Sequence, residues 1–242
     1  MVRTPASRIH QVISKEQVLE RRLVDLRITG QELSHTRTNN IEVIERLLHN
    51  DPHLTFGMKI VEEAVSAGSL DKEAVLKIIS GITKCSNDVG FEAGLGFISP
   101  KATLSGLRRA GSLLQTTALN GGVIAFGTGH PGALVQFHQA LANMAREWGW
   151  RVAHPAGCAK LTERLHLDFI GDVALASDTC GAHNSHDCQF MERFIESFPG
   201  KIDLVVADHG FVGPAVNRGI PVSRSWTLTT RRSRSLNTLA PI

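Results

Sequence analysis

The sequence contains no tyrosine and few other aromatic residues, and no stripe of basic residues runs through its main body. Nucleic-acid-binding proteins combine clustered Lys and Arg with such features, so we expect no nucleic-acid partner. No apolar run approaches the roughly 20 residues of a membrane span. Residues 1–22 are charged throughout and lack the apolar core of a signal peptide. We therefore expect a cytoplasmic protein that does not bind a membrane.

Cysteine is scarce as well. The four residues, Cys85, Cys158, Cys180 and Cys188, are scattered and form no Cys-x-x-Cys pair. This spacing indicates neither a zinc knuckle nor a disulfide framework. We expect all four to be small buried thiols.

The stretch from Gly121 to Leu141 predicts a strand, a glycine-rich turn and a helix. Its apolar run Val123–Phe126 is typical of a strand buried on both faces. Apolar residues then recur at helical spacing, and Pro131 suits the first helical position because it has no N–H to leave unpaired. Such a turn directs backbone N–H groups and a helix N-terminus at one point, which favours a bound phosphate. The predicted phosphate-binding residues are Gly127, Thr128, Gly129, His130 and Gly132.

The same letters satisfy Gly-x-Gly-x-x-Gly, the dinucleotide-binding pattern. That pattern also requires an acidic residue about twenty positions further on, at the end of the next strand. The next predicted strand, Arg151–Ala153, is followed by His154-Pro155-Ala156-Gly157, which holds no carboxylate. We therefore expect no nicotinamide cofactor. A turn that only lets the helix pack on the strand stays open as an alternative.

The predicted elements divide the chain into a helical N-terminal portion (1–120), an α/β portion (121–222) and an atypical tail (223–242). Helices of the first portion are expected near residues 9–29, 41–48, 56–67, 70–79 and 100–120, with a long ordered loop at 81–100. Strands are expected near residues 123–126, 151–153, 173–176 and 202–207 and from 220, and helices near 131–144, 186–198 and 211–218. Residues 161–167 are predicted to be helical or irregular. Alternating strands and helices predict a Rossmann-like α/β fold, a mainly parallel sheet with flanking helices.

Polar side chains follow the predicted strands. In parallel sheets ligands bind beyond the carboxyl ends of the strands, where His130, Asp178, Asp208 and His209 are expected. We predict that His130 stabilises developing charge and that Asp208 and His209 position or deprotonate a water molecule. Capping of the next helix is the alternative role for Asp208.

A candidate site for a divalent metal ion lies near the third of these strands. His183 and His186 are three residues apart and can share one face of a helix. Together with Asp178 they form the predicted metal ligands. The alternative is a loop whose histidines cap the helix and bind the backbone.

Several motifs occur together between residues 90 and 222: Phe97–Pro100, Phe126–Leu134, His183–His186 before Met191-Glu192, Ala207–Phe211 and Arg218–Pro221. With its Gly-Thr-Gly-His-Pro and Asp-His-Gly strings, this set resembles a bacterial family of phosphatases that is common in actinobacteria. The family places its paired histidines one residue apart, closer to the Met-Glu, so the two chains differ at the predicted metal ligands. The resemblance implies phosphate chemistry on a small phosphorylated substrate.

The tail departs from this family, whose members continue after Gly-Ile-Pro with an acidic stretch containing Asn-Asp-Pro. Residues 223–242 carry four arginines and no acid, and show no helix or strand period. Read one base earlier, the codons of Trp226-Thr can give Asp, and those of Thr229-Thr-Arg-Arg can give Asn-Asp-Pro-Ala. We hypothesise a frameshift near Val222. If so, an acidic group of the site is missing and the chain is inactive, and an intact frame in the source DNA would end the idea.

The sequence thus favours a hydrolase that acts on a small phosphomonoester, with the phosphate on the Gly127–Gly132 turn and a divalent metal ion as an optional partner. One alternative is a nucleotide- or sugar-phosphate-binding module without turnover. The other is a dinucleotide-dependent oxidoreductase.

Overall fold

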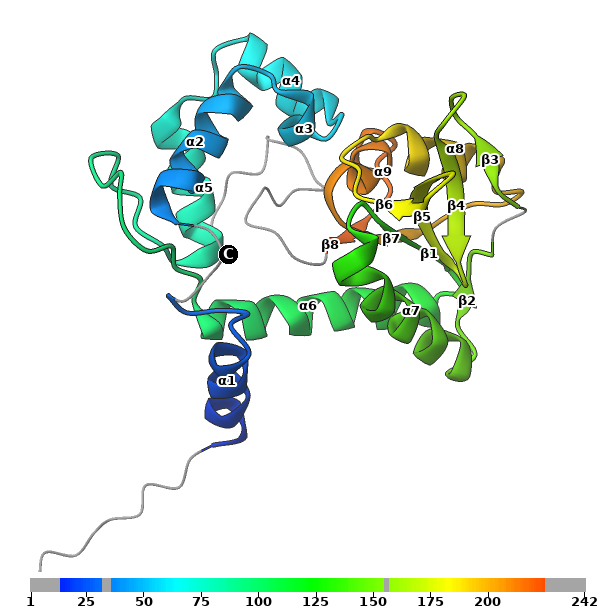
Figure 1. Ribbon diagram of the computed structural model, residues 1–242. Coiled ribbons are helices and arrows are strands. Elements are labelled where there is room, and N and C mark those ends of the chain that lie inside the picture. Colours follow the sequence, from blue (N-terminus) through cyan, green and yellow to red (C-terminus); the bar gives the residue numbers. More distant parts are fainter. Residues whose placement is uncertain (1–13, 32–35, 155–156, 225–242) are drawn as a thin grey trace, which may run out of the picture.

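The computed structural model describes residues 14–31, 36–154 and 157–224. Figure 1 shows a group of helices on one side of the molecule, a sheet with its own helices on the other, and the long helix α6 between them. The helices are α1 (Lys15–Asp25), α2 (Arg37–Leu48), α3 (Pro52–Thr55), α4 (Lys59–Ser66), α5 (Lys72–Thr83), α6 (Pro100–Leu119), α7 (Pro131–Glu147), α8 (Gln189–Ser197), the 3-10 turn η1 (His209–Val212) and α9 (Gly213–Asn217). The strands are β1 (Val123–Thr128), β2 (Arg151–Val152), β3 (Ala159–Lys160), β4 (His166–Ile170), β5 (Val173–Asp178), β6 (Gly181–His183), β7 (Leu204–Ala207) and β8 (Val222–Arg224).

The strands form one mixed sheet in the order β3-β4-β5-β1-β7-β8, with β2 beside β1 and β6 beside β5. Strand β1 is central: it pairs in parallel with β2, β5 and β7, and β7 pairs in parallel with β8. The pairs β3–β4, β4–β5 and β5–β6 are antiparallel. The α/β fold with its parallel centre and flanking helices is therefore confirmed.

Helices cover both faces of this sheet. Successive side chains of a strand point to opposite faces, so neighbouring residues of β1 belong to two different cores. Ala125 of β1 lies in the core that contains Phe194 of α8 and Phe211 of η1. Its neighbour Phe126 lies in the other core, with Leu114 of α6. All six β1 residues are buried, as a strand covered on both faces requires.

The helices α2, α3 and α5 have a separate apolar core, to which Ile44, Leu54 and Leu76 contribute. Side-chain caps begin these helices: Thr36 accepts from the N–H of Asn39 before α2, and Asp71 from that of Ala74 before α5. The helix predicted at 56–67 is α4, which begins at Lys59, and the short helix α3 precedes it. Phe56 between them is left-handed, with φ 53°, which ends the first helix.

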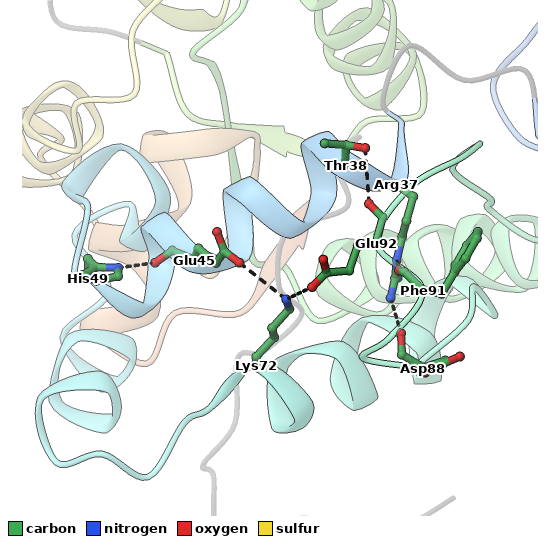
Figure 2. Close-up of polar contacts among 8 residues, drawn as sticks. All are labelled: Arg37, Thr38, Glu45, His49, Lys72, Asp88, Phe91 and Glu92. Atoms are coloured by element: carbon green, nitrogen blue, oxygen red, sulfur yellow. Dashed lines mark hydrogen bonds and ion pairs between the residues drawn. The ribbon is translucent and has the colours of Figure 1, made fainter.

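The long loop predicted at 81–100 is present between α5 and α6, and it surrounds Arg37. The guanidinium of Arg37 donates to the carbonyl oxygens of Phe91 (2.6 Å), Asp88 (2.8 Å) and Ser86 (3.0 Å), and it lies over the Phe91 ring. Figure 2 shows Arg37 with Asp88 and Phe91, beside Lys72, whose Nζ lies 2.9 Å from Glu92. Arg37 is buried, so the carbonyls of the loop satisfy a cation that would otherwise lack partners.

Several predicted boundaries are wrong. Residues 161–165 are irregular, as predicted, but His166 and Leu167 of the same predicted segment belong to strand β4. Helix α8 begins at Gln189, which leaves His186 in the preceding loop. The part of the predicted helix 9–29 that precedes residue 14 lies outside the described residues, as do residues 225–242 of the tail.

None of the four thiols is buried: Cys85 and Cys188 are half-buried, and Cys158 and Cys180 are exposed. No helix in the described ranges is both long and apolar enough to cross a membrane.

Candidate functional site

Three histidines from distant parts of the sequence meet beyond the carboxyl ends of strands β1 and β7. His130 lies between β1 and α7, His186 precedes α8, and His209 begins η1 after β7. The ring centroids of His130 and His209 are 3.8 Å apart, and His186 lies 4.6 Å from His209 and 5.3 Å from His130. One ligand atom from each residue lies within 4.8 Å of the other two. We call this group the three-histidine site.

Two glycines let the three segments approach one another. A Cβ on Gly129 would overlap the carbonyl oxygen of Ser185, whose N–H donates to the Gly129 carbonyl at 2.8 Å. A Cβ on Gly210 would overlap the carbonyl of His186. The loop that carries His186 therefore fits between the other two turns only because both positions lack a side chain.

Asp208 fixes the orientation of two of these rings. Its Oδ2 lies 2.7 Å from Nδ1 of His209 and 3.2 Å from Nδ1 of His130, and its side chain is fully buried. Nδ1 of His186 lies 2.9 Å from the carbonyl oxygen of His53, at the other side of the site. These acceptors place a proton on each Nδ1, so the Nε2 lone pair of each ring is available to a ligand.

The electrostatics favour neutral imidazoles at His186 and His209 and an ionised carboxylate at Asp208. Burial raises the pKa of Asp208, but the hydrogen bonds from His130 and His209 outweigh it and hold the pKa well below its usual range. Burial lowers the pKa of His209 although Asp208 opposes the shift, and burial also lowers the pKa of His186. Oδ1 of Asp208 is buried without a hydrogen-bond partner in the described part of the chain. A cation among the three rings would offset this buried negative charge.

These features fit a divalent metal ion. Neutral imidazole nitrogens are common ligands of zinc and neighbouring transition metals, and ligating histidines usually donate their other N–H to a carboxylate or backbone carbonyl. The residues that would hold the ion are His130, His186 and His209, with Asp208 and the His53 carbonyl behind them.

The conformation of His209 is unusual: its φ is 48°. Non-glycine residues adopt this left-handed region at a cost of about 1–3 kcal/mol, and such residues cluster at functional sites. Here the conformation turns the ring toward His130 while Nδ1 stays on the carboxylate of the preceding residue.

The comparisons with known proteins identify the family of this chain. The model of the family described as Phosphatase matches residues 14–224. The chain belongs to the Phosphatase family. A similar protein is Phosphatase SCO2771 of Streptomyces coelicolor, which is 28% identical over 207 residues, 84% of this chain and 76% of that protein. No solved structure matches the chain.

The glycine turn is the predicted phosphate-binding segment of this member of the Phosphatase family. Gly127 and Thr128 belong to strand β1, and a Cβ on Gly127 would meet Met191 and Phe211. Gly127 is therefore buried and closely packed inside the central strand. The turn itself consists of the buried Gly129 and the partly exposed His130, and only Gly132, in the first turn of α7, is exposed. The N-terminus of α7 is the part of the predicted phosphate site that a ligand can reach.

The predicted metal ligands are separated by the structure. His186 belongs to the three-histidine site, whereas Nδ1 of His183 lies 3.5 Å from Oδ2 of Asp178 on the β5–β6 hairpin. Asp178 and His183 are absent from the group of described residues whose ligand atoms converge. The sequence-based choice failed because His186 lies in a loop, where the three-residue spacing does not put two side chains on one face.

A cysteine nucleophile is disfavoured in this member of the Phosphatase family. Cys158 lies six residues before Arg164, but the two are on the β3–β4 hairpin and not at a helix start. The hydrogen bond of the Cys158 thiol to Asp168, at 2.8 Å, raises the pKa of the thiol. A raised pKa keeps the group as the weakly nucleophilic thiol.

One buried residue near the site was not predicted. His138 of α7 is fully buried, and burial lowers its pKa against the opposing effects of Asp208 and a hydrogen bond with the Gly127 backbone. Its neighbour Phe137, by contrast, is 39% exposed. A polar residue inside an apolar stripe gives no hydrophobic signal, which explains the omission.

Proposed function

We propose that this member of the Phosphatase family hydrolyses a small phosphomonoester at the three-histidine site with a divalent metal ion. The observation that carries the proposal is that Nδ1 of all three rings is held by the protein, at 2.7–3.2 Å from its acceptors. Three Nε2 atoms are therefore left to act on one ligand. Family membership supports the reaction class, and the geometry supports the place.

The bound ion would polarise a phosphoryl oxygen and lower the pKa of a coordinated water. The chain's own residues prepare the site for this chemistry. Asp208 is fully buried, so it acts through His130 and His209 by fixing their tautomer and orientation. This differs from the sequence-based expectation that Asp208 itself deprotonates a water. The N–H groups of His130 and Ala133 donate to Thr128 and to the His130 carbonyl. The exposed Gly132, in the first turn of α7, would therefore be the residue that receives a phosphate oxygen, since the helix dipole favours an anion there.

The protein surroundings keep the site partly closed. The side chain of His130 is 26% exposed and that of His209 is 11% exposed. Phe56, which is buried, lies with its ring 5.5 Å from that of His209 and 5.7 Å from that of His186. Ligands therefore approach on the side of His130 and not through Phe56.

The test is phosphate release from p-nitrophenyl phosphate and a panel of small phosphomonoesters, with protein stripped by chelator and then loaded with Zn²⁺, Mn²⁺ or Co²⁺. We expect turnover that needs metal and falls at least about a hundredfold in His186→Ala and His209→Ala. His183→Ala is the matched control, because that ring lies on the β5–β6 hairpin. Full activity of His186→Ala would contradict the assignment of the site.

The same assay separates the alternatives. Binding of sugar phosphates or nucleotides with no turnover under any metal condition would favour a binding module. A substrate-dependent change in nicotinamide absorbance would favour an oxidoreductase.

A further inference from the structure

The helical part of the chain contributes directly to the three-histidine site. The corner between α3 and α4, residues 53–58, contacts Cys188 before α8, His209 of η1 and Gly213 of α9. Figure 1 shows α3 and α4 on the side of the helical group that faces α9. The carbonyl of His53 accepts from Nδ1 of His186, and the Phe56 ring contacts the rings of His186 and His209. Elements that are more than 120 residues apart in sequence thus build one site.

Asn217, at the end of α9, holds this corner in place. Its Nδ2 donates to the carbonyl of Gly57 at 2.7 Å, and its Oδ1 accepts from the N–H of Lys59 at 3.0 Å. A Cβ on Gly57 would overlap Cys188, and one on Gly213 would overlap the carbonyl of Phe56. The corner is therefore packed closely and hydrogen-bonded on both sides, which fixes the position of His53 relative to the site.

The side chain of His53 is exposed beside this site. Its ring centroid lies 5.9 Å from that of His186, with the two rings edge to face. The backbone carbonyl of His53 anchors His186. The imidazole of His53 is exposed, so solvent or a ligand can reach it. A phosphate ester carries one to two negative charges, and a fourth imidazole is the group at hand to donate to its outer oxygens.

We propose that His53 is a substrate-binding residue that donates a hydrogen bond to a phosphate oxygen of a ligand held at the three-histidine site. This inference rests on the proposed function, since it assumes a phosphorylated ligand there. It assigns to the helical part a role in recognition of the phosphate group and not only in folding.

The experiment compares wild-type protein, His53→Ala, His53→Gln and His49→Ala, each loaded with Zn²⁺. His49 is the matched control: it is an exposed histidine four residues earlier, and its Nδ1 lies 2.6 Å from the Glu45 carbonyl. Three quantities are measured: zinc stoichiometry, the Kd of inorganic phosphate by calorimetry, and kcat and KM for p-nitrophenyl phosphate.

We expect His53→Ala to keep the zinc stoichiometry and to weaken phosphate binding about tenfold or more, the size of one hydrogen bond to a charged group. KM should rise by a similar factor and by more than kcat falls. His53→Gln, which keeps a donor, should recover part of the loss, and His49→Ala should match the wild type. A merely structural role for His53 would lower zinc binding or kcat and would not show rescue by glutamine.

An unchanged phosphate Kd and KM in His53→Ala would overturn the inference, and so would absence of phosphate binding by the zinc-loaded wild type. The phosphate arm also separates the two proposals. If no ester is hydrolysed but phosphate binds and the binding depends on His53, the hydrolase proposal fails and the assignment of His53 stands.

Discussion

The substitution Asp208→Asn tests how the buried carboxylate acts. The side chain is fully buried, and Oδ2 accepts hydrogen bonds from Nδ1 of both His130 and His209. Asparagine keeps the shape and one carbonyl oxygen but removes the charge. Hydrogen bonds to charged groups contribute about 1.5–3 kcal/mol and neutral ones about 1 kcal/mol, so the change costs about 1 kcal/mol for each bond.

Two such bonds give a loss of about 2 kcal/mol, or about 30-fold in metal affinity at 1.4 kcal/mol per tenfold. This lies within the 10- to 100-fold loss that follows removal of a group behind a metal ligand. The assay is competition for Zn²⁺ against a chelating dye, with the free energy of unfolding of the metal-free protein measured in parallel.

Asp178→Asn is the matched control, because Asp178 also faces a histidine, His183 at 3.5 Å, but outside the three-histidine site. We expect the control to bind zinc like the wild type. If Asp208→Asn keeps wild-type zinc affinity, or if Asp178→Asn loses as much, the argument that Asp208 orients two metal ligands is refuted.

Three further changes test the close packing at Gly129, the ion pair of Asp172 and the loop around Arg37. Gly129→Ala should lower the free energy of unfolding by about 1–3 kcal/mol through overpacking and weaken zinc binding, measured by urea denaturation and dye competition; wild-type values for both would show that the loop has room. Asp172→Asn should destabilise at pH 7, because burial raises the pKa of Asp172 but hydrogen bonds from Arg146 at 2.6 Å outweigh it and lower the pKa. An aspartate whose pKa is lowered by folding stabilises the folded protein at pH values above the ordinary aspartate pKa of about 4, and this stabilisation is lost as the pH falls through the folded-state pKa. The difference between the urea midpoints of the wild type and Asp172→Asn should therefore shrink from pH 6 to pH 3. A difference that stays constant would contradict the assignment. Arg37→Met should speed hydrogen exchange in residues 84–98 and leave the sheet unchanged; equal exchange rates would show that the guanidinium does not hold the loop.

The sequence predicted the fold at the level of its elements because the α/β portion is locally consistent. The apolar run before Gly127 and the runs before Asp178 and Asp208 form β1, β5 and β7, the parallel centre of the sheet. The rule that ligand residues follow such strands predicted that His130, Asp178, Asp208 and His209 lie together. Asp178 lies beside His183 instead, but the structure places His130 and His209 in contact with Asp208. Their catalytic role stays a prediction.

The rest of the site depends on contacts that no local pattern reveals. His186 reaches the other histidines because its loop passes between two glycine turns, so its partners follow from packing and not from its spacing to His183. His53 precedes His130, the first histidine of the site, by more than 70 residues. Its position results from the docking of the helical part through Asn217. The frameshift hypothesis for the tail stays a prediction, since residues 225–242 lie outside the described part of the chain.

The central claim is that His130, His186 and His209 bind one metal ion. The direct measurement is the visible absorption spectrum of the metal-free protein during titration with Co²⁺, which reports the ligands and the geometry of the bound ion. We predict saturation at one ion per chain, with bands typical of nitrogen ligands that vanish in a variant with all three histidines replaced by alanine. A wild-type protein without such bands, or a triple variant that retains them, would contradict the account.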